Sequence, residues 1–144
     1  MLAVVALAAS AAPASALSLG IGSGTTLAPM QPGQTATGNG SLSITSLASW
    51  SLSVSGSGAG RMVAAATGCT GSDAQLTNAL TVSATVGGVT SARKTISATD
   101  TLLTSGSGLL SAFTATTNYS QTIPSTQVMR TGCVYTLTAT YTLQ

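Results

Sequence analysis

Apolar residues alternate with serine and threonine along much of the chain. In the clearest stretch, Tyr135 to Leu143, apolar side chains fill the odd-numbered positions and threonines the even-numbered ones. The same period of two runs through Ser49 to Ser55 and Leu80 to Val86. Successive side chains of a strand point to opposite faces. The pattern therefore predicts strands with one buried face and one hydroxyl-bearing face.

Glycine and proline punctuate these segments. Turns are predicted at Gly56–Gly60 and Thr104–Gly108, a hairpin at Gly87-Gly88, and a break at Pro124. Further strands are expected near Leu17–Ile21, over Ser41–Leu47, Val89–Ala98 and Thr114–Gln121, and a short helix or helical turn near Gly71–Asn78.

These elements predict an all-β fold, an antiparallel β-sandwich of about seven to nine strands. The bulky candidates for its core are Trp50, Phe113, Tyr135 and Tyr141. A β-helix is the alternative architecture, but the sequence shows no fixed repeat period in its favour.

The N-terminus has the pattern of a secretory signal. Residues 1–16 form an uncharged, alanine-rich apolar run that ends in the small residues Ala14-Ser15-Ala16, which suit signal peptidase. The run is too short to span a membrane, which needs about 20 apolar residues. We therefore expect a signal peptide at 1–16, a flexible or extended lead-in at 17–39 and the β-sandwich domain at 40–144, with no transmembrane segment after signal removal.

The composition narrows the chemistry that the chain can perform. It has 21 serines and 25 threonines among 144 residues, but only four basic and two acidic residues and no histidine. The net charge of +2 is too small to attract nucleic acid strongly. The apolar content of 44% and its regular alternation argue against disorder.

Catalytic and metal-binding constellations are missing from the sequence. Without histidine a Ser-His-Asp triad is impossible, and two cysteines alone do not form a zinc site. The only acids, Asp73 and Asp100, are better explained as turn residues than as a glycosidase pair. The sequence therefore predicts a protein that is not an enzyme and needs no cofactor. Two N-glycosylation patterns begin at Asn39 and Asn118.

Cys69 and Cys133 are the only cysteines. An even number of cysteines in an exported protein favours a disulfide, so we expect these two to pair. Two separate buried thiols are the alternative.

Two short motifs resemble those of a known family. Trp50 and Leu52 form one Trp-x-Leu pattern, and Tyr141 and Leu143 form a second one in which tyrosine replaces tryptophan. This resembles the WxL domain of Gram-positive surface proteins, and segment 118–124 is similar to the approach to that family's final strand. The resemblance implies a secreted β-sandwich held noncovalently on the cell wall, with affinity for peptidoglycan. The same four residues are also expected as core side chains at alternating strand positions.

The sequence thus favours an exported, non-enzymatic cell-surface module that associates with peptidoglycan or another surface glycan. The alternative is a self-assembling subunit of an extracellular filament or layer, because strands without charge leave their edges poorly protected. In that alternative the segment Leu17 to Asn39 donates a strand to a neighbouring molecule.

Overall fold

Within the part of the chain that the structure describes, twelve strands form two six-stranded sheets. The computed structural model describes residues 3–11, 17–65, 74–108, 110–129 and 133–144. Sheet A has the order β10 (Thr101–Gly106), β5 (Trp50–Gly56), β12 (Tyr135–Leu143), β1 (Ala3–Ala11) and β3 (Thr25–Leu27), with β6 (Val63–Ala64) also paired to β12. Sheet B has the order β2 (Ser18–Ser23), β4 (Thr35–Ser46), β11 (Leu110–Thr122), β7 (Thr81–Val86) and β8 (Val89–Thr90), with β9 (Lys94–Thr95) also paired to β7.

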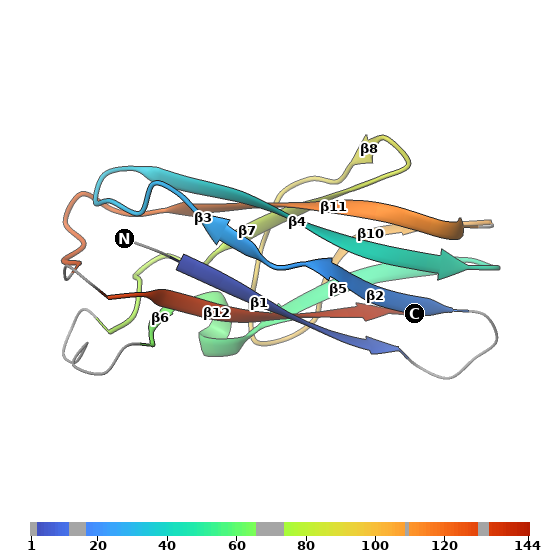
Figure 1. Cartoon of the computed structure of the whole chain (residues 1–144), viewed down its shortest axis with the longest axis horizontal. Helices are drawn as coiled ribbons and strands as arrows, with labels where there is room; N and C mark the ends of the chain where they lie inside the picture. The colour runs from blue at the N-terminus through green and yellow to red at the C-terminus, as the bar shows by residue number, and fades with distance from the viewer. Residues whose placement is uncertain (1–2, 12–16, 66–73, 109, 130–132) are drawn as a thin grey trace.

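The sheets pack face to face, with β4 and β11 in one layer and β1 and β12 in the other (Figure 1). Inward-facing side chains of both sheets form one hydrophobic core. Trp50, Tyr135 and Tyr141 are buried there as predicted, while Phe113 is only partly buried against it. Tyr119 is a further large core side chain, which the sequence pattern did not single out.

The predicted all-β sandwich is confirmed, but the expected number of strands was too low. Four of the strands, β3, β6, β8 and β9, contain only two or three residues, which is too short for alternation to reveal them. The sandwich is also not purely antiparallel, since β1 runs parallel to β12.

Individual elements differ from the expectations in two places. The return strand predicted over Val89–Ala98 is split into β8 and β9, and between them the Ser91 hydroxyl accepts a hydrogen bond from the Ala84 amide at 3.0 Å. The turn predicted at Thr104–Gly108 is wrong in its first half, because β10 continues to Gly106, which pairs with Trp50. The Gly87-Gly88 hairpin is confirmed, with φ of 60° and 79° at the two glycines.

The glycine-rich segment after β5 forms a short 3-10 helix, η1 (Ser57–Gly60). Gly60 has a φ of 78° and is buried beside the backbone of Ile96. Its carbonyl accepts a hydrogen bond from the Leu80 amide at 2.7 Å, and the Ile96 amide donates to the Leu80 carbonyl at 2.9 Å. Three distant segments therefore meet at this glycine. Part of the helical turn expected at 71–78 lies outside the described residues, and 74–78 contain no helix.

The segment expected as a signal peptide contributes β1, and the expected lead-in contributes β2, β3 and the start of β4. The strand predicted near Leu17–Ile21 is confirmed as β2. The chain passes from sheet B to sheet A between β2 and β3 at Gly24, where an added Cβ would lie 3.1 Å from the Val5 carbonyl oxygen. Cleavage after Ala16 stays a prediction.

Candidate functional site

The structure brings the two Trp-x-Leu-like motifs together as neighbouring strands. Leu52 of β5 pairs with Leu143 of β12, and Tyr141 lies two residues along the same ladder. The ladder continues past the motifs, because Ser51 and Gln144 exchange backbone hydrogen bonds of 2.7 and 3.0 Å. Leu52, Tyr141 and Leu143 are fully buried and Trp50 is 8% exposed, so all four side chains form part of the core.

Tyr141 also links the two sheets through a buried hydrogen bond. Its hydroxyl lies 2.6 Å from that of Tyr119, which projects inward from β11 of sheet B. Burial raises the pKa of Tyr141 far above the usual value of a phenol, and its partner Tyr119 raises it further. Burial also raises the pKa of Tyr119, while the hydrogen bond with Tyr141 opposes that rise. Both phenols are therefore held neutral as a structural pair.

Replacing Tyr119 by phenylalanine should lower the free energy of unfolding by about 2 kcal/mol, because the Tyr141 hydroxyl would stay buried without this partner. The double replacement of Tyr119 and Tyr141 by phenylalanine should cost less than the sum of the two single replacements. Chemical denaturation of the four proteins measures this coupling. Strictly additive costs would show that the hydroxyl pair contributes no coupling energy.

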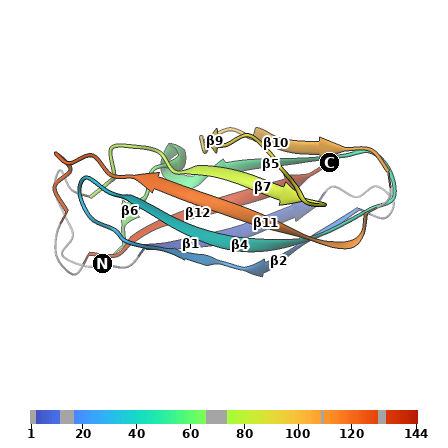
Figure 2. The same cartoon turned by 90° about the horizontal axis from the view of Figure 1, so that it is seen from above.

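The outer surface of sheet B carries a regular array of uncharged polar side chains. The pairing of β4, β11 and β7 aligns them in three rows, which we call the hydroxyl face: Thr37, Ser120 and Thr81; Asn39, Asn118 and Ser83; Ser41, Thr116 and Thr85. Ser83 is only 5% exposed, so the middle row presents mainly the two asparagines. The three strands lie side by side in Figure 2. Rows on such a sheet repeat about every 7 Å along a strand, and neighbouring strands are about 4.8 Å apart.

Contacts within the hydroxyl face hold several of these side chains in place. Asn118 donates from Nδ2 to the Thr85 hydroxyl at 3.4 Å, and Thr81 donates to the Ser120 carbonyl at 2.8 Å. Arg93 reaches the Asn118 carbonyl at 3.3 Å and places a guanidinium beside this face. The asparagines of the two glycosylation patterns, Asn39 and Asn118, are direct cross-strand partners in the middle row.

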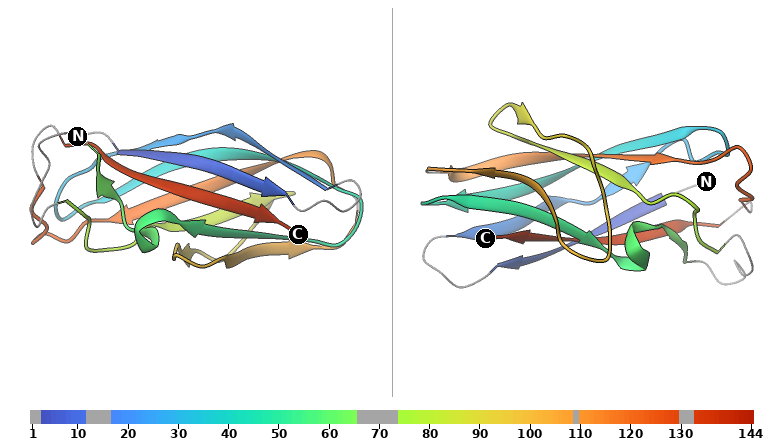
Figure 3. Two further views of the ribbon diagram at one scale, coloured as in Figure 1. Left: turned by 90° about the horizontal axis from the view of Figure 1, so that it is seen from below. Right: turned by 180° about the vertical axis from the view of Figure 1, so that it is seen from behind.

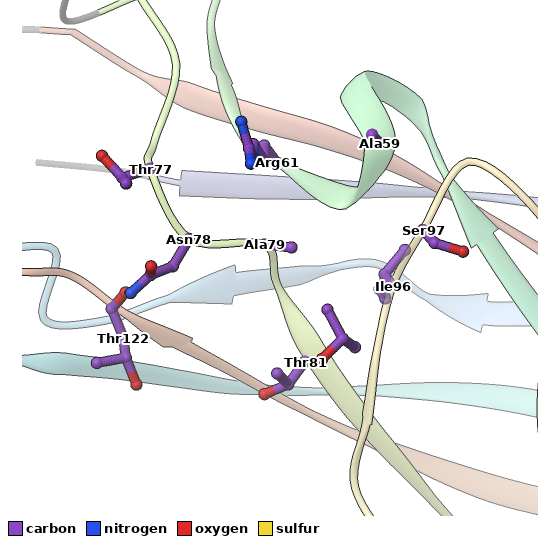
Figure 4. Close-up of a pocket in the computed structure, with 10 residues that line it drawn as sticks. Ala59, Arg61, Thr77, Asn78, Ala79, Thr81, Ile96, Ser97 and Thr122 are labelled. Atoms are coloured by element: carbon purple, nitrogen blue, oxygen red, sulfur yellow. The ribbon is translucent and has the colours of Figure 1, made fainter.

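A pocket of about 580 Å³ lies at one end of the hydroxyl face, where Thr81 and Thr122 form part of its wall (Figure 4). The other lining residues come from η1 and the segment after it, from the loop before β7, and from β9 and the residues after it: Ala59, Arg61, Thr77, Asn78, Ala79, Thr95, Ile96 and Ser97. Six of the ten lining residues have hydroxyl or amide side chains, and among these described lining residues Arg61 is the one with a charge.

The loop before β7 is fixed by hydrogen bonds to the end of β11 and to the segment after it. Asn78 donates from Nδ2 to the Thr122 carbonyl at 3.0 Å, and buried Gln121 donates from Nε2 to the Asn78 carbonyl at the same distance. The Thr77 hydroxyl donates to Gln127 Oε1 at 2.7 Å. The hydroxyl hydrogen of Thr77 is used in this bond, and that of Thr81 is used in its bond to the Ser120 carbonyl. Both hydroxyl oxygens can therefore still accept a hydrogen bond from a ligand. The exposed Arg61 guanidinium supplies donors.

Among the described residues that the sequence singled out, Asp100 and Cys133 do not line this pocket. Asp100 is exposed, whereas Asp73 and Cys69 lie outside the described residues. Cys133 is buried just before β12, and its pairing with Cys69 stays a prediction. The described part of the chain contains no group of three or more side chains suited to hold a metal ion. No helix among the described residues has the length and apolar character needed to cross a bilayer.

No protein-family model matches the chain, and no curated protein matches its sequence. The resemblance to the WxL domain therefore remains a prediction from the motifs.

Sequence reasoning did not identify the pocket or the hydroxyl face as sites. The pocket combines residues that are far apart in the chain, such as Arg61, Asn78 and Ser97. The hydroxyl face depends on strand register, which alternation within single strands does not reveal. Alternation within Leu80–Val86 did place Val82, Ala84 and Val86 on the inward face, and all three are buried in β7.

Proposed function

We propose that this protein is a non-enzymatic, exported cell-surface module that binds cell-wall glycan, with peptidoglycan as the expected ligand. The hydroxyl face and the adjoining pocket form the contact surface in this proposal. The proposed form has the Cys69–Cys133 disulfide. Alkylation adds mass only to free thiols, so the mass of the unreduced, unfolded chain should stay the same after alkylation if the disulfide is present.

The observation that carries the proposal is the chemistry of the outer surface of sheet B. Its rows offer hydroxyl and amide groups at regular spacing, and Lys94 is the only charged residue in any described strand. Glycans present hydroxyl and amide groups that exchange hydrogen bonds with such a surface. The carboxylates of peptidoglycan stem peptides are suitable partners for Arg61.

Sedimentation with purified, insoluble peptidoglycan tests the proposal. The protein should be retained well above an albumin control, and Thr116→Glu should reduce the retained fraction several-fold because Thr116 is exposed in the hydroxyl face and the added carboxylate repels those of the ligand. Thr138→Glu is the matched control, since Thr138 is an exposed threonine on β12 of the other sheet. Retention no greater than that of albumin would refute glycan binding.

Replacing Arg61 by alanine should weaken peptidoglycan binding about five-fold, because an exposed guanidinium contributes a modest charge-assisted hydrogen bond. The free energy of unfolding should change by less than about 0.5 kcal/mol, since the described residues provide no hydrogen-bond or ion-pair partner for the Arg61 side chain. Binding isotherms and denaturation curves measure the two effects. Lys94→Ala removes the same charge outside the pocket lining and should bind like the wild type.

Self-assembly into an extracellular filament or layer is the second candidate function. It is supported by the edge strands β2, β3 and β10, which contain no charged residue. Charged side chains on edge strands normally block pairing between molecules. Light scattering over a concentration series tests this candidate, and a strict monomer at high concentration would refute it.

A further inference from the structure

Strand β1 lies within sheet A, between β12 and β3. All nine of its residues pair with β12, from Ala3 with Tyr135 to Ala11 with Leu143. On its other side, Ala3–Val5 pair with β3. The left view of Figure 3 shows the blue β1 beside the red β12. Ala3 and Val5 are fully buried, and Leu7 packs against the core.

The outward face of β1 differs from that of its neighbours in sheet A. Val4 is 38% exposed and Ala6 is also exposed, whereas β12 and β5 present threonine and serine outward. The segment is therefore apolar on both faces. Apolar residues on the exposed face are unusual for a strand, and a run of this composition suits the apolar core of an export signal.

We propose that export and cleavage after Ala16 remove β1 and leave an open strand-acceptor slot between β12 and β3. We further infer that the slot receives the N-terminal segment Leu17–Ile21 of a second copy of the chain. This inference rests on the export that the proposed function requires, and it gives the self-assembly candidate a specific mechanism.

The slot has the properties of a strand-binding site. Removal of β1 would free one edge of β12 along the nine residues of that strand and would take away the strand partner of β3. It would also uncover apolar side chains of the core that Ala3, Val5 and Leu7 cover. An added strand pairs with the free N–H and C=O groups of such an edge through main-chain hydrogen bonds, and its alternate side chains fill the uncovered part of the core.

The segment Leu17–Ile21 fits the role of donor. Leu17, Leu19 and Ile21 alternate with the small residues Ser18 and Gly20, as Ala3, Val5 and Leu7 alternate in β1. The segment lies at the edge of sheet B, because β2 pairs with β4 on one side and has no described strand on the other. Leu17 and Leu19 are half-buried, and Ile21 is 39% exposed.

Charge and symmetry favour a second copy as the source of the donor. The strands β1, β2, β3 and β12 contain no charged residue, so no electrostatic repulsion opposes the exchange. Each processed chain would have one slot and one donor. A head-to-tail contact of this kind produces a ring or an open filament, according to the rotation between copies.

Two forms of the full sequence and one peptide test the inference. The exported form is purified and its N-terminus determined by mass, and an unprocessed form is made by cell-free translation without membranes. The probe is a fluorescent peptide of residues 3–11 with a C-terminal lysine tag, and a peptide with Val5→Asp is the control. The exported form should begin at Leu17 and self-associate. Added probe should bind to the assemblies and dissociate them to monomers, because it fills the slot in place of the donor segment. The unprocessed form should stay monomeric and bind neither peptide.

Two variants of the exported form separate the donor from the slot. Ile21→Asp should give a monomer that still binds the probe, because the donor is impaired and the slot is intact. Val89→Asp, at a valine that is 73% exposed on β8, should assemble like the wild type.

An exported chain that retains residues 3–11 would overturn the inference. So would a processed wild-type chain that remains monomeric, or assemblies that the probe does not dissociate. Peptidoglycan sedimentation of the same samples measures glycan binding independently of strand exchange. A processed monomer that binds peptidoglycan would overturn the strand exchange alone.

Discussion

Replacing Gly60 by alanine is expected to lower the free energy of unfolding by about 4 kcal/mol. Two costs combine at this position. The φ of 78° lies in the left-handed region, and an added Cβ would collide with the carbonyl group of Ile96. The colliding atoms belong to the backbone, so no side-chain rotation relieves the overlap. Thermal or chemical denaturation measures the loss.

Gly88 offers a matched control for the Gly60 replacement. Its φ of 79° is nearly the same, but a Cβ added there would have no neighbour within 4 Å. Gly88→Ala should therefore cost only about 1 kcal/mol, which is the conformational penalty by itself. Equal losses at the two positions would show that the contact with Ile96 adds nothing.

Replacing Trp50 by alanine is also expected to cost about 4 kcal/mol, because it removes a large buried side chain and leaves a cavity. The indole ring packs closely over Gly106 of β10, where an added Cβ would lie 2.7 Å from Cζ2. Its loss should therefore loosen the pairing of β10 with β5. Denaturation curves measure the stability, and hydrogen exchange measures protection of the β10 amides.

The Trp50 replacement also separates a structural role from a binding role. Leu102→Ala, at a leucine on β10 that is 53% exposed, is a control with a small expected loss of about 0.5 kcal/mol. A Trp50→Ala protein with unchanged stability but no peptidoglycan binding would contradict the core role. It would support direct ligand contact by the Trp-x-Leu motif.

The sequence predicted the strands whose two faces differ in polarity. Thr136 to Thr142 alternate with buried residues along β12, and the serines of β5 do the same. The sequence predicted a signal peptide, not a strand, for the N-terminal segment that forms β1. This segment is apolar on both faces, and an uninterrupted apolar run is also the pattern of an export signal. Two-residue strands such as β8 and β9 are too short to show any period.

The candidate site was less predictable because it depends on contacts between distant segments. Burial of Trp50 and Tyr141 followed from their alternating positions, but the partner of the Tyr141 hydroxyl did not. The Tyr119 hydroxyl lies close to the Tyr141 hydroxyl only because β11 of sheet B packs against β12 of sheet A. The pocket likewise joins Arg61 to Thr122, and no local pattern connects these two residues.

The scarcity of ionisable side chains gives the fold an unusual response to acid and base. Stability changes with pH only where the folded and unfolded chains bind different numbers of protons. With two carboxyl side chains and no histidine, few groups contribute to that difference between acid and neutral pH. The buried phenols act at the alkaline end. Their pKa values are raised in the folded state, so the unfolded chain loses these protons first above about pH 10, and stability falls there. With so few titratable groups, the free energy of unfolding should change little between acid and neutral pH.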